Sequence, residues 1–290
     1  MDKKSTTVAE ALRQRFEDLT RAERQLADTL LSHYPAAGLG SITALAEKAE
    51  VSTPTVARLV KKLGFTGYPE FQESLRGELD AATIGPITKH DARSAEAPDE
   101  HMLNRFAEAV TTNLRSTFSR IDPASFDVAA GLLADQNRGV SIVGGRITRA
   151  LADYLFTHMQ VIRDSVTLVP STASSWPHYL LSMSPGDVLV VFDVRRYEND
   201  LVRFAEIARE RQVTVILFTD QWGSPVAKHA QHVFNCRVEA PSAWDSTAIM
   251  LVVVEALIAA TENLRWDATR ERMEVLEDLF DRTGLLKKFL

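Results

Sequence analysis

A short segment of this sequence gathers hydroxyl and cationic side chains with no carboxylate among them. Between Val51 and Gly64 there are three cations and no acid. Hydroxyls at a helix start can reach phosphate oxygens or base edges, an arginine can pair with a guanine edge, and lysines suit phosphates. The expected DNA-contacting residues are Ser52, Thr53, Thr55, Arg58, Lys61 and Lys62.

The same cations have a simpler interpretation. A solvated face near a helix C-terminus favours lysine without any ligand. The net charge of −6 gives the whole chain no overall attraction to DNA. Residues 1–85, which contain this segment, are not basic either, because they carry 11 basic and 12 acidic side chains. Any DNA contact must therefore come from this local patch.

A second set of polar residues follows the apolar runs in the other part of the chain. Arg146, Arg195 and Arg196 could recognise an anion through their guanidinium forks, whereas Asp193 would attract a cation. The alternative is an aspartate–arginine network in a pocket that no longer binds anything. The expected ligand-binding residues are Gly144, Gly145, Arg146, Thr148, Asp193, Arg195, Arg196, Thr219, Asp220, Ser224 and Ser242.

Two short helices around a three-residue break are expected to position the cationic segment. Thr20 and Glu23 form a capping box before one helical stripe, and Ser41 caps a short helix that stops at residues 49–51. Ser52 then caps a further helix, with Pro54 in its first turn and Gly64 after its end. This spacing predicts a helix-turn-helix whose second helix is the reader.

The polar loops of the other part are expected at the carboxyl ends of parallel strands. Strand-like runs occur at 139–143, 165–169, 188–194, 213–218 and 233–238, separated by helical stretches. This alternation predicts an open, doubly wound, mostly parallel sheet, in which ligands bind beyond the strand ends. The sequence therefore predicts an all-α helix-turn-helix domain at 1–81, a linker at 82–100 and an α/β domain at 101–290.

Composition excludes several classes of protein. The chain of 290 residues has a mean hydropathy of −0.10 and one cysteine, Cys236, so no intramolecular disulfide is possible. Its longest apolar run, Ala248 to Val254, stops at Glu255. Even when carried through to Ala260 it is shorter than the roughly 20 residues of a spanning helix, and no signal peptide is visible. We expect a cytoplasmic protein with no membrane partner, no metal site and no cofactor.

The helical half resembles a known family at many positions. Leu45-Ala46-Glu47, Val51-Ser52, Thr55-Val56-x-Arg58 and the run from Lys62 to Phe71 (KLGFTGYPEF) look like the DNA-binding domain of RpiR-type transcriptional regulators. One departure is Glu50, where such turns often carry glycine. The family joins this domain to a C-terminal sugar-isomerase (SIS) domain, which residues 105–265 resemble.

The resemblance to the SIS domain includes a departure at the expected ligand loop. The family's Ser-x-Ser-Gly-x-Thr loop wraps a sugar phosphate, but the matching stretch here runs from Asp193 to Glu198 (DVRRYE). Arg146 also replaces the second glycine of the family's first loop. Because carboxylates stand where a phosphate would lie, a carboxylate-bearing, amine-bearing or zwitterionic ligand is as plausible as a phosphosugar.

Three functions are compatible with these residues. The first is a non-enzymatic regulator that binds double-stranded operator DNA, senses a carbohydrate- or amino-acid-derived effector with or without a phosphate, and forms a homodimer or homotetramer. The second is a phosphosugar isomerase with an appended helical domain, for which Glu255 is the one candidate base. The third is a protein-interaction module. We favour the first and assign no catalytic residue.

Overall fold

The computed structural model describes residues 6–89 and 101–284, which form two compact units. The first contains the described residues up to Ser116 with the segments Asp220–Ser224 and Arg237–Ser246. The second contains the remaining described residues. The greater part of the predicted linker at 82–100 lies outside the described residues, so the predicted domain boundaries stay predictions.

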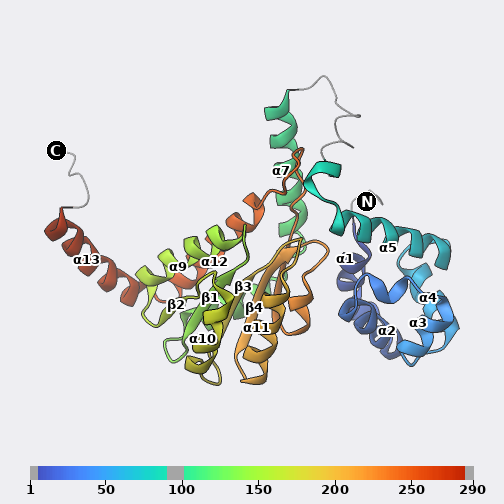
Figure 1. Cartoon of the computed structure of the whole chain (residues 1–290), viewed down its shortest axis with the longest axis horizontal. Coiled ribbons are helices and arrows are strands. Elements are labelled where there is room, and N and C mark those ends of the chain that lie inside the picture. Colours follow the sequence, from blue (N-terminus) through green and yellow to red (C-terminus); the bar gives the residue numbers. More distant parts are fainter. Residues whose placement is uncertain (1–5, 90–100, 285–290) are drawn as a thin grey trace. The chain divides into compact units, whose positions relative to one another are not determined.

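The N-terminal region is all-helical, as predicted (Figure 1). The Thr20 hydroxyl accepts the Glu23 N–H while the Glu23 carboxylate accepts the Thr20 N–H, and Ser41 accepts the Ala44 N–H, so both predicted caps are confirmed. Leu26, Leu45, Leu59, Phe71 and Leu75 share one buried core. The elements are α1 (Val8–Gln14), η1 (Phe16–Asp18), α2 (Arg21–Ser32), η2 (Ala36–Gly38), α3 (Ile42–Lys48), α4 (Thr53–Lys62) and α5 (Tyr68–Thr83), and α7 (Met102–Phe118) follows.

A five-stranded sheet forms the centre of the second half of the chain. Its strands are β1 (Val140–Gly144), β2 (Val166–Leu168), β3 (Val188–Phe192), β4 (Thr214–Asp220) and β5 (His232–Cys236). The order is β2-β1-β3-β4-β5, and the pairings β1–β2, β1–β3 and β3–β4 are parallel. In this order the chain changes direction across the sheet between β1 and β3, which places a topological switch point there.

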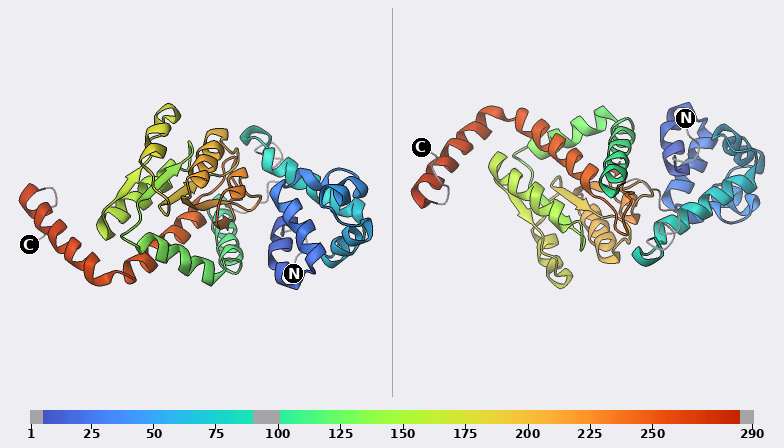
Figure 2. Two further views of the ribbon diagram at one scale, coloured as in Figure 1. Left: turned by 90° about the horizontal axis from the view of Figure 1, so that it is seen from below. Right: turned by 90° about the horizontal axis from the view of Figure 1, so that it is seen from above.

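Helices cover both faces of this sheet (Figures 1 and 2). Alternate strand residues divide between two cores, so that Val190 faces one and Val191 faces the other. The first core is closed by α8 (Pro123–Ala134), α9 (Arg149–Ile162) and α12 (Ala248–Asn263), and the second by α10 (Trp176–Ser182) and α11 (Asn199–Glu210). The prediction of a doubly wound α/β fold is confirmed. The 3₁₀ turns η3 (Ala173–Ser175) and η4 (Pro225–Lys228) and the final helix α13 (Trp266–Thr283) complete the described elements.

Candidate nucleic-acid interface and ligand site

The turn between α3 and α4 has the geometry that the sequence predicts. Glu50 adopts φ 52°, in the left-handed region, and the Val51 N–H donates to the Ala46 carbonyl at 2.9 Å. Ser52 occupies the N-cap position of α4, and Gly64 ends the helix with φ 96°. A glycine would adopt the Glu50 conformation with less strain, but local hydrogen bonding holds the glutamate there.

The outer side of α4 carries two exposed cations. Arg58 and Lys61 are exposed, as is Ser52 before the helix, and Thr53 is half-buried. On the inner side, Val56 and Leu59 are fully buried against the domain core. This arrangement leaves α4 free to present Arg58 and Lys61 to a partner while its apolar stripe fixes the helix in place.

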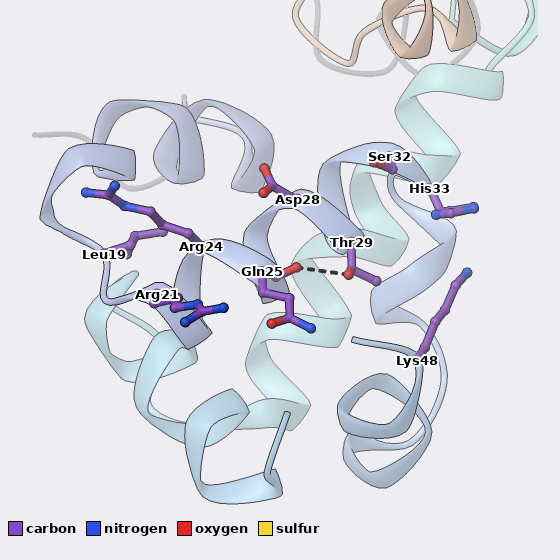
Figure 3. Close-up of a pocket in the computed structure, with 9 residues that line it drawn as sticks. All are labelled: Leu19, Arg21, Arg24, Gln25, Asp28, Thr29, Ser32, His33 and Lys48. Atoms are coloured by element: carbon purple, nitrogen blue, oxygen red, sulfur yellow. Dashed lines mark hydrogen bonds between the residues drawn. The ribbon is translucent and has the colours of Figure 1, made fainter. Parts of the chain in front are cut away.

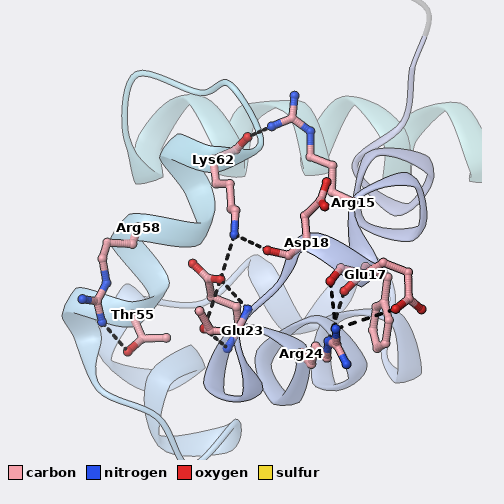
Figure 4. Close-up of polar contacts among 10 residues, drawn as sticks. Arg15, Glu17, Asp18, Glu23, Arg24, Thr55, Arg58 and Lys62 are labelled. Carbon is pink, nitrogen blue, oxygen red and sulfur yellow. Dashed lines mark hydrogen bonds and ion pairs between the residues drawn. The ribbon is translucent and has the colours of Figure 1, made fainter.

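Thr55 departs from the prediction that it faces outward, because it is 5% exposed. It lies one turn before Leu59 and therefore shares the inner face of α4. Its hydroxyl contacts the Ser52 hydroxyl at 2.9 Å. It also accepts the Arg58 Nη2–H at 3.3 Å (Figure 4). Thr55 thus orients the guanidinium rather than presenting its own hydroxyl.

Lys62 also departs from the expected free cation. Its Nζ lies 3.1 Å from a Glu23 carboxylate oxygen and donates to the Asp18 carbonyl at 2.7 Å (Figure 4). Burial opposes the ionisation of Glu23, but the Thr20 N–H, Lys62 and the Thr20 hydroxyl together outweigh it, so the pKa of Glu23 is lowered. The charge of Lys62 is therefore already engaged within the domain.

Sequence reasoning did not anticipate a hollow of about 760 Å³ on the α2 side of the domain (Figure 3). Arg21 and Lys48 contribute its cationic groups, His33 contributes an imidazole, and Asp28 contributes a carboxyl whose pKa burial raises. Arg24 lies at the same place, but its Nη2 donates to the Glu17 carbonyl at 2.8 Å and its guanidinium covers the Phe16 ring. The mixture of charges distinguishes this hollow from the purely cationic α4.

At the sheet, the switch point brings the ends of β1 and β3 together. The Gly145 N–H donates to the Phe192 carbonyl at 3.1 Å, and the Thr148 hydroxyl donates to the same carbonyl at 2.7 Å. A side chain at Gly144 would lie 2.7 Å from the Thr148 carbonyl oxygen, so only glycine fits this turn. Gly144, Gly145 and Thr148 therefore shape the turn with their backbone and hydroxyl groups.

Glu198 closes this turn with its carboxylate. Its Oε1 accepts the Arg146 N–H at 2.7 Å, and it would lie 2.7 Å from a β-carbon placed on Gly145. The Glu198 N–H in turn points to Oδ1 of the buried Asp193 at 3.4 Å. A backbone donor at the start of α9 that could bind an incoming anion is thus used by the chain itself.

The arginines predicted for this site border the same loops. Arg146 and Arg196 are exposed and Arg195 is half-buried. Asp193, with 2% of its surface exposed, directly follows β3, and Thr219 lies buried on the adjacent strand β4. The structure therefore places three guanidinium-bearing residues and two carboxylates on the loops after β1 and β3.

Three other predicted residues lie in turns further along the chain. The Asp220 Oδ1 accepts the N–H groups of Trp222 and Gly223 at 3.0 and 3.1 Å, and Ser224 is buried. The Ser242 hydroxyl accepts the Trp244 N–H at 3.1 Å. With these bonds Asp220 and Ser242 stabilise their own turns, and their role in ligand binding stays a prediction.

Glu255, the candidate base of the isomerase alternative, is exposed on α12. Its Oε1 accepts the Tyr154 hydroxyl at 3.0 Å, a hydrogen bond that raises the pKa of Tyr154. Within residues 6–89 and 101–284, no group of three or more His, Cys, Asp or Glu side chains could hold a metal ion. None of the helices in these ranges is long and apolar enough to span a membrane.

Comparison with known proteins identifies both halves of the chain. Residues 6–82 match the helix-turn-helix domain of the rpiR family, and residues 132–260 match the SIS domain. The chain belongs to the RpiR family of transcriptional regulators. The resemblance found in the sequence is thereby confirmed, as are the helix-turn-helix and SIS fold classes.

Named relatives agree with this assignment. The HTH-type transcriptional regulator HexR of Pseudomonas aeruginosa is 29% identical over 224 residues, which cover 76% of this chain and 75% of HexR. The sugar isomerase domain of an RpiR transcription factor from Sphaerobacter thermophilus has a TM-score of 0.56 at 22% identity, covering 61% of this chain and 97% of that one. The NanR protein of Vibrio vulnificus, solved with ManNAc-6P, has a TM-score of 0.54 at 19% identity, covering 93% and 98%. The two structures are similar to this chain in fold.

Proposed function

We propose that this regulator binds operator DNA through α4 and senses a small anionic or zwitterionic metabolite through its SIS domain. The observation that carries the DNA-binding part is the exposure of Arg58 and Lys61 on a helix that a three-residue turn and an apolar stripe hold in place. We assign the base-edge contact to Arg58 and a phosphate contact to Lys61. Ser52 and Thr53 at the helix start are assigned to the phosphate backbone.

We further propose that the helix-turn-helix domain occupies residues 1–81, the linker 82–100 and the SIS domain 101–290, and that the chain acts as a homodimer or homotetramer. Two recognition helices would then read half-sites about 34 Å apart, one turn of the duplex. An effector can alter DNA binding only if it binds more tightly to one of two arrangements of the helix-turn-helix domains.

The effector proposal rests on the charges around the switch point. The carboxylate of Glu198 already accepts the Arg146 N–H, which an anion at this turn would otherwise use. We therefore assign recognition of the effector's anionic group to the guanidiniums of Arg146, Arg195 and Arg196. Asp193 and Glu198 would face an ammonium group where the effector has one. The phosphosugar seen with NanR belongs to a protein of only 19% identity and does not fix the effector here.

DNA binding is tested by fluorescence anisotropy of the full-length protein with the DNA upstream of its own gene. We expect specific binding that Arg58→Ala with Lys61→Ala removes, and that Arg209→Ala, an exposed arginine on α11, leaves unchanged. Binding equal to that of unrelated DNA, or specific binding that survives the double substitution, would contradict the assignment and favour a protein-interaction module.

The effector is tested by thermal denaturation with amino acids, carboxylates and phosphosugars. A ligand at 100 times its dissociation constant stabilises by about 2.7 kcal/mol. We expect at least one anionic or zwitterionic compound of this panel to stabilise the protein. Arg195→Ala with Arg196→Ala should remove the effect without weakening DNA binding in the absence of ligand. Stabilisation by a ligand that is undiminished in this double variant would contradict the assignment.

Isomerase activity is the alternative, and we propose that it is absent. Aldose–ketose isomerisation needs a base beside the sugar carbons, and the exposed Glu255 is hydrogen-bonded to Tyr154. Incubation with a panel of phosphosugars should give no turnover. Efficient isomerisation that Glu255→Gln abolishes would reverse this conclusion.

A further inference from the structure

The C-terminal end of α4 is held by a turn that precedes α2. The Arg15 guanidinium donates to the Lys62 carbonyl, and the Lys62 Nζ donates back to the Asp18 carbonyl at 2.7 Å (Figure 4). Arg15 lies where α1 meets η1, and its carbonyl accepts the Asp18 N–H at 2.9 Å. Two reciprocal contacts therefore fix this turn against the last residue of α4.

Arg15 completes the hydrogen bonding at this helix end. A helix leaves its last carbonyls without a donor from within the helix. The carbonyls of residues 59–61 accept N–H groups of residues 63–65 at 2.9–3.2 Å, whereas the Lys62 carbonyl accepts the Arg15 Nη1–H. The guanidinium thereby covers the negative end of the α4 dipole.

The rest of the Arg15 guanidinium is available to a partner. Arg15 is exposed, and no acceptor for its Nε–H and Nη2–H groups occurs in the parts of the chain that the structure describes. These two groups form one edge of the planar fork, and such an edge can bind two oxygens of a phosphate at once.

The length of α4 brings this end of the helix to the duplex backbone. α4 has 10 residues and is about 15 Å long at about 1.5 Å per residue. The major groove is about 12 Å wide, and a recognition helix contacts base edges with its N-terminal residues. When α4 enters the groove in this way, its C-terminal end reaches the phosphates that border the groove. A bare helix end would repel them, because its dipole is negative there.

We propose that Arg15 binds a phosphate at the border of the major groove while it holds the Lys62 carbonyl. The inference rests on the proposed binding of DNA through α4 and adds a contact from outside the helix-turn-helix. A phosphate contact carries no sequence information. Loss of the Arg15 contact should therefore weaken binding to operator and to unrelated DNA by the same factor.

Two carboxylates of the η1 turn oppose the approach of a phosphate. Glu17 lies 3.8 Å from the Arg24 guanidinium, which compensates part of its charge. Asp18 is exposed beside Arg15. Asp18→Asn should therefore strengthen binding to both kinds of DNA, and weaker binding by this variant would count against a phosphate at this place.

The experiment measures the salt dependence of DNA binding by the full-length protein, using fluorescence anisotropy with the DNA upstream of its own gene and with unrelated DNA. Arg15→Gln removes the charge but keeps an N–H donor for the Lys62 carbonyl. We expect it to lower the slope of log affinity against log salt by about 0.9 per helix-turn-helix domain. Arg15→Lys, which keeps the charge, should restore most of this slope.

Arg24→Gln is the matched control, because Arg24 also donates to carbonyls of the η1 turn, those of Phe16 and Glu17, at 3.2 and 2.8 Å. It should leave the slope unchanged. If closing a turn were the whole role of Arg15, the two glutamine variants would behave alike. Urea denaturation of each variant checks that the fold is intact.

Ethylation of single phosphates identifies the contact directly. Ethylation of a phosphate at the groove border should interfere with binding by the wild type and no longer interfere with binding by Arg15→Gln. An unchanged interference pattern together with an unchanged slope would overturn the proposal and leave the DNA-binding function standing. If the wild type binds no DNA specifically, the proposed function itself fails, and the role of Arg15 fails with it.

Discussion

Two adjacent lysines on α4 should respond differently to removal, although the sequence gives them the same role. Lys61 is exposed, whereas Lys62 lies 3.1 Å from the Glu23 carboxylate and also donates to the Asp18 carbonyl. Lys61→Ala should therefore weaken DNA binding and leave the fold intact. Lys62→Ala should destabilise the helix-turn-helix domain and leave the salt dependence of DNA binding unchanged.

The expected sizes follow from these contacts. Each phosphate contact contributes about 0.9 to the slope of log affinity against log salt, so Lys61→Ala should reduce the slope by about 1.8 in a dimer on two half-sites. Across a fourfold change in salt, that alters the affinity ratio between wild type and variant about 12-fold. Lys62→Ala removes charge-assisted bonds at a side chain that is 34% exposed, which we place at about 1–2 kcal/mol.

The stability effect also has a definite pH dependence. The pKa of Glu23 is lower in the folded domain than in the unfolded chain, so its stabilisation is complete above the unfolded pKa and disappears as the pH falls through the folded pKa. The difference in unfolding free energy between wild type and Lys62→Ala should therefore shrink in acid.

Urea denaturation from neutral to acid pH, together with anisotropy titrations at several salt concentrations, measures both effects. A Lys62→Ala variant of unchanged stability that lowers the salt slope by as much as Lys61→Ala would refute the reasoning. It would mean that Lys62 leaves Glu23 and binds a phosphate when DNA is present.

Three further predictions concern single hydroxyl and carboxyl groups. Thr55→Val should lower specific DNA affinity several-fold and leave non-specific affinity unchanged, because the Arg58 guanidinium loses the hydroxyl that orients it; equal loss of both affinities in anisotropy would count against this. Glu198→Ala should free the Arg146 N–H, so that titration calorimetry detects inorganic phosphate binding in the variant and none in the wild type. Burial raises the pKa of Glu78, whose carboxyl accepts the Val8 N–H at 2.9 Å. The contribution of Glu78 to the stability of the folded domain should therefore be present in acid and decline as the pH rises through the raised pKa. Glu78→Gln should remove this trend in pH-dependent denaturation.

Local signals in the sequence were sufficient for the fold. The capping box at Thr20, the cap at Ser41 and the positions of Pro54 and Gly64 each depend on neighbours within a few residues. Strand β3 was recognisable because a buried parallel strand is a continuous apolar run, and all five of its residues are buried. Such signals need no knowledge of the rest of the chain, and all were confirmed.

Errors arose where a side chain's environment comes from elsewhere in the chain. The partner of Lys62 lies 39 residues before it, and no spacing rule connects Lys62 with Glu23. Thr55 differs, because its position four residues before the buried Leu59 was a usable sign that it faces inward. Glu255 lies in an apolar run but is exposed, as is Val252 one turn earlier, so the run does not mark a helix buried on every side.

The departures from the family's pattern at the switch point are connected through one hydrogen bond. Replacing the second glycine of the first loop by Arg146 keeps a backbone N–H there, and Glu198, where the family has threonine, takes that N–H. The close approach of the Glu198 carboxylate to the Arg146 N–H also needs a glycine at position 145, since a β-carbon on Gly145 would lie 2.7 Å from the carboxylate oxygen. An anion that binds at this turn must therefore be recognised by side chains, because the Arg146 N–H is already taken by Glu198.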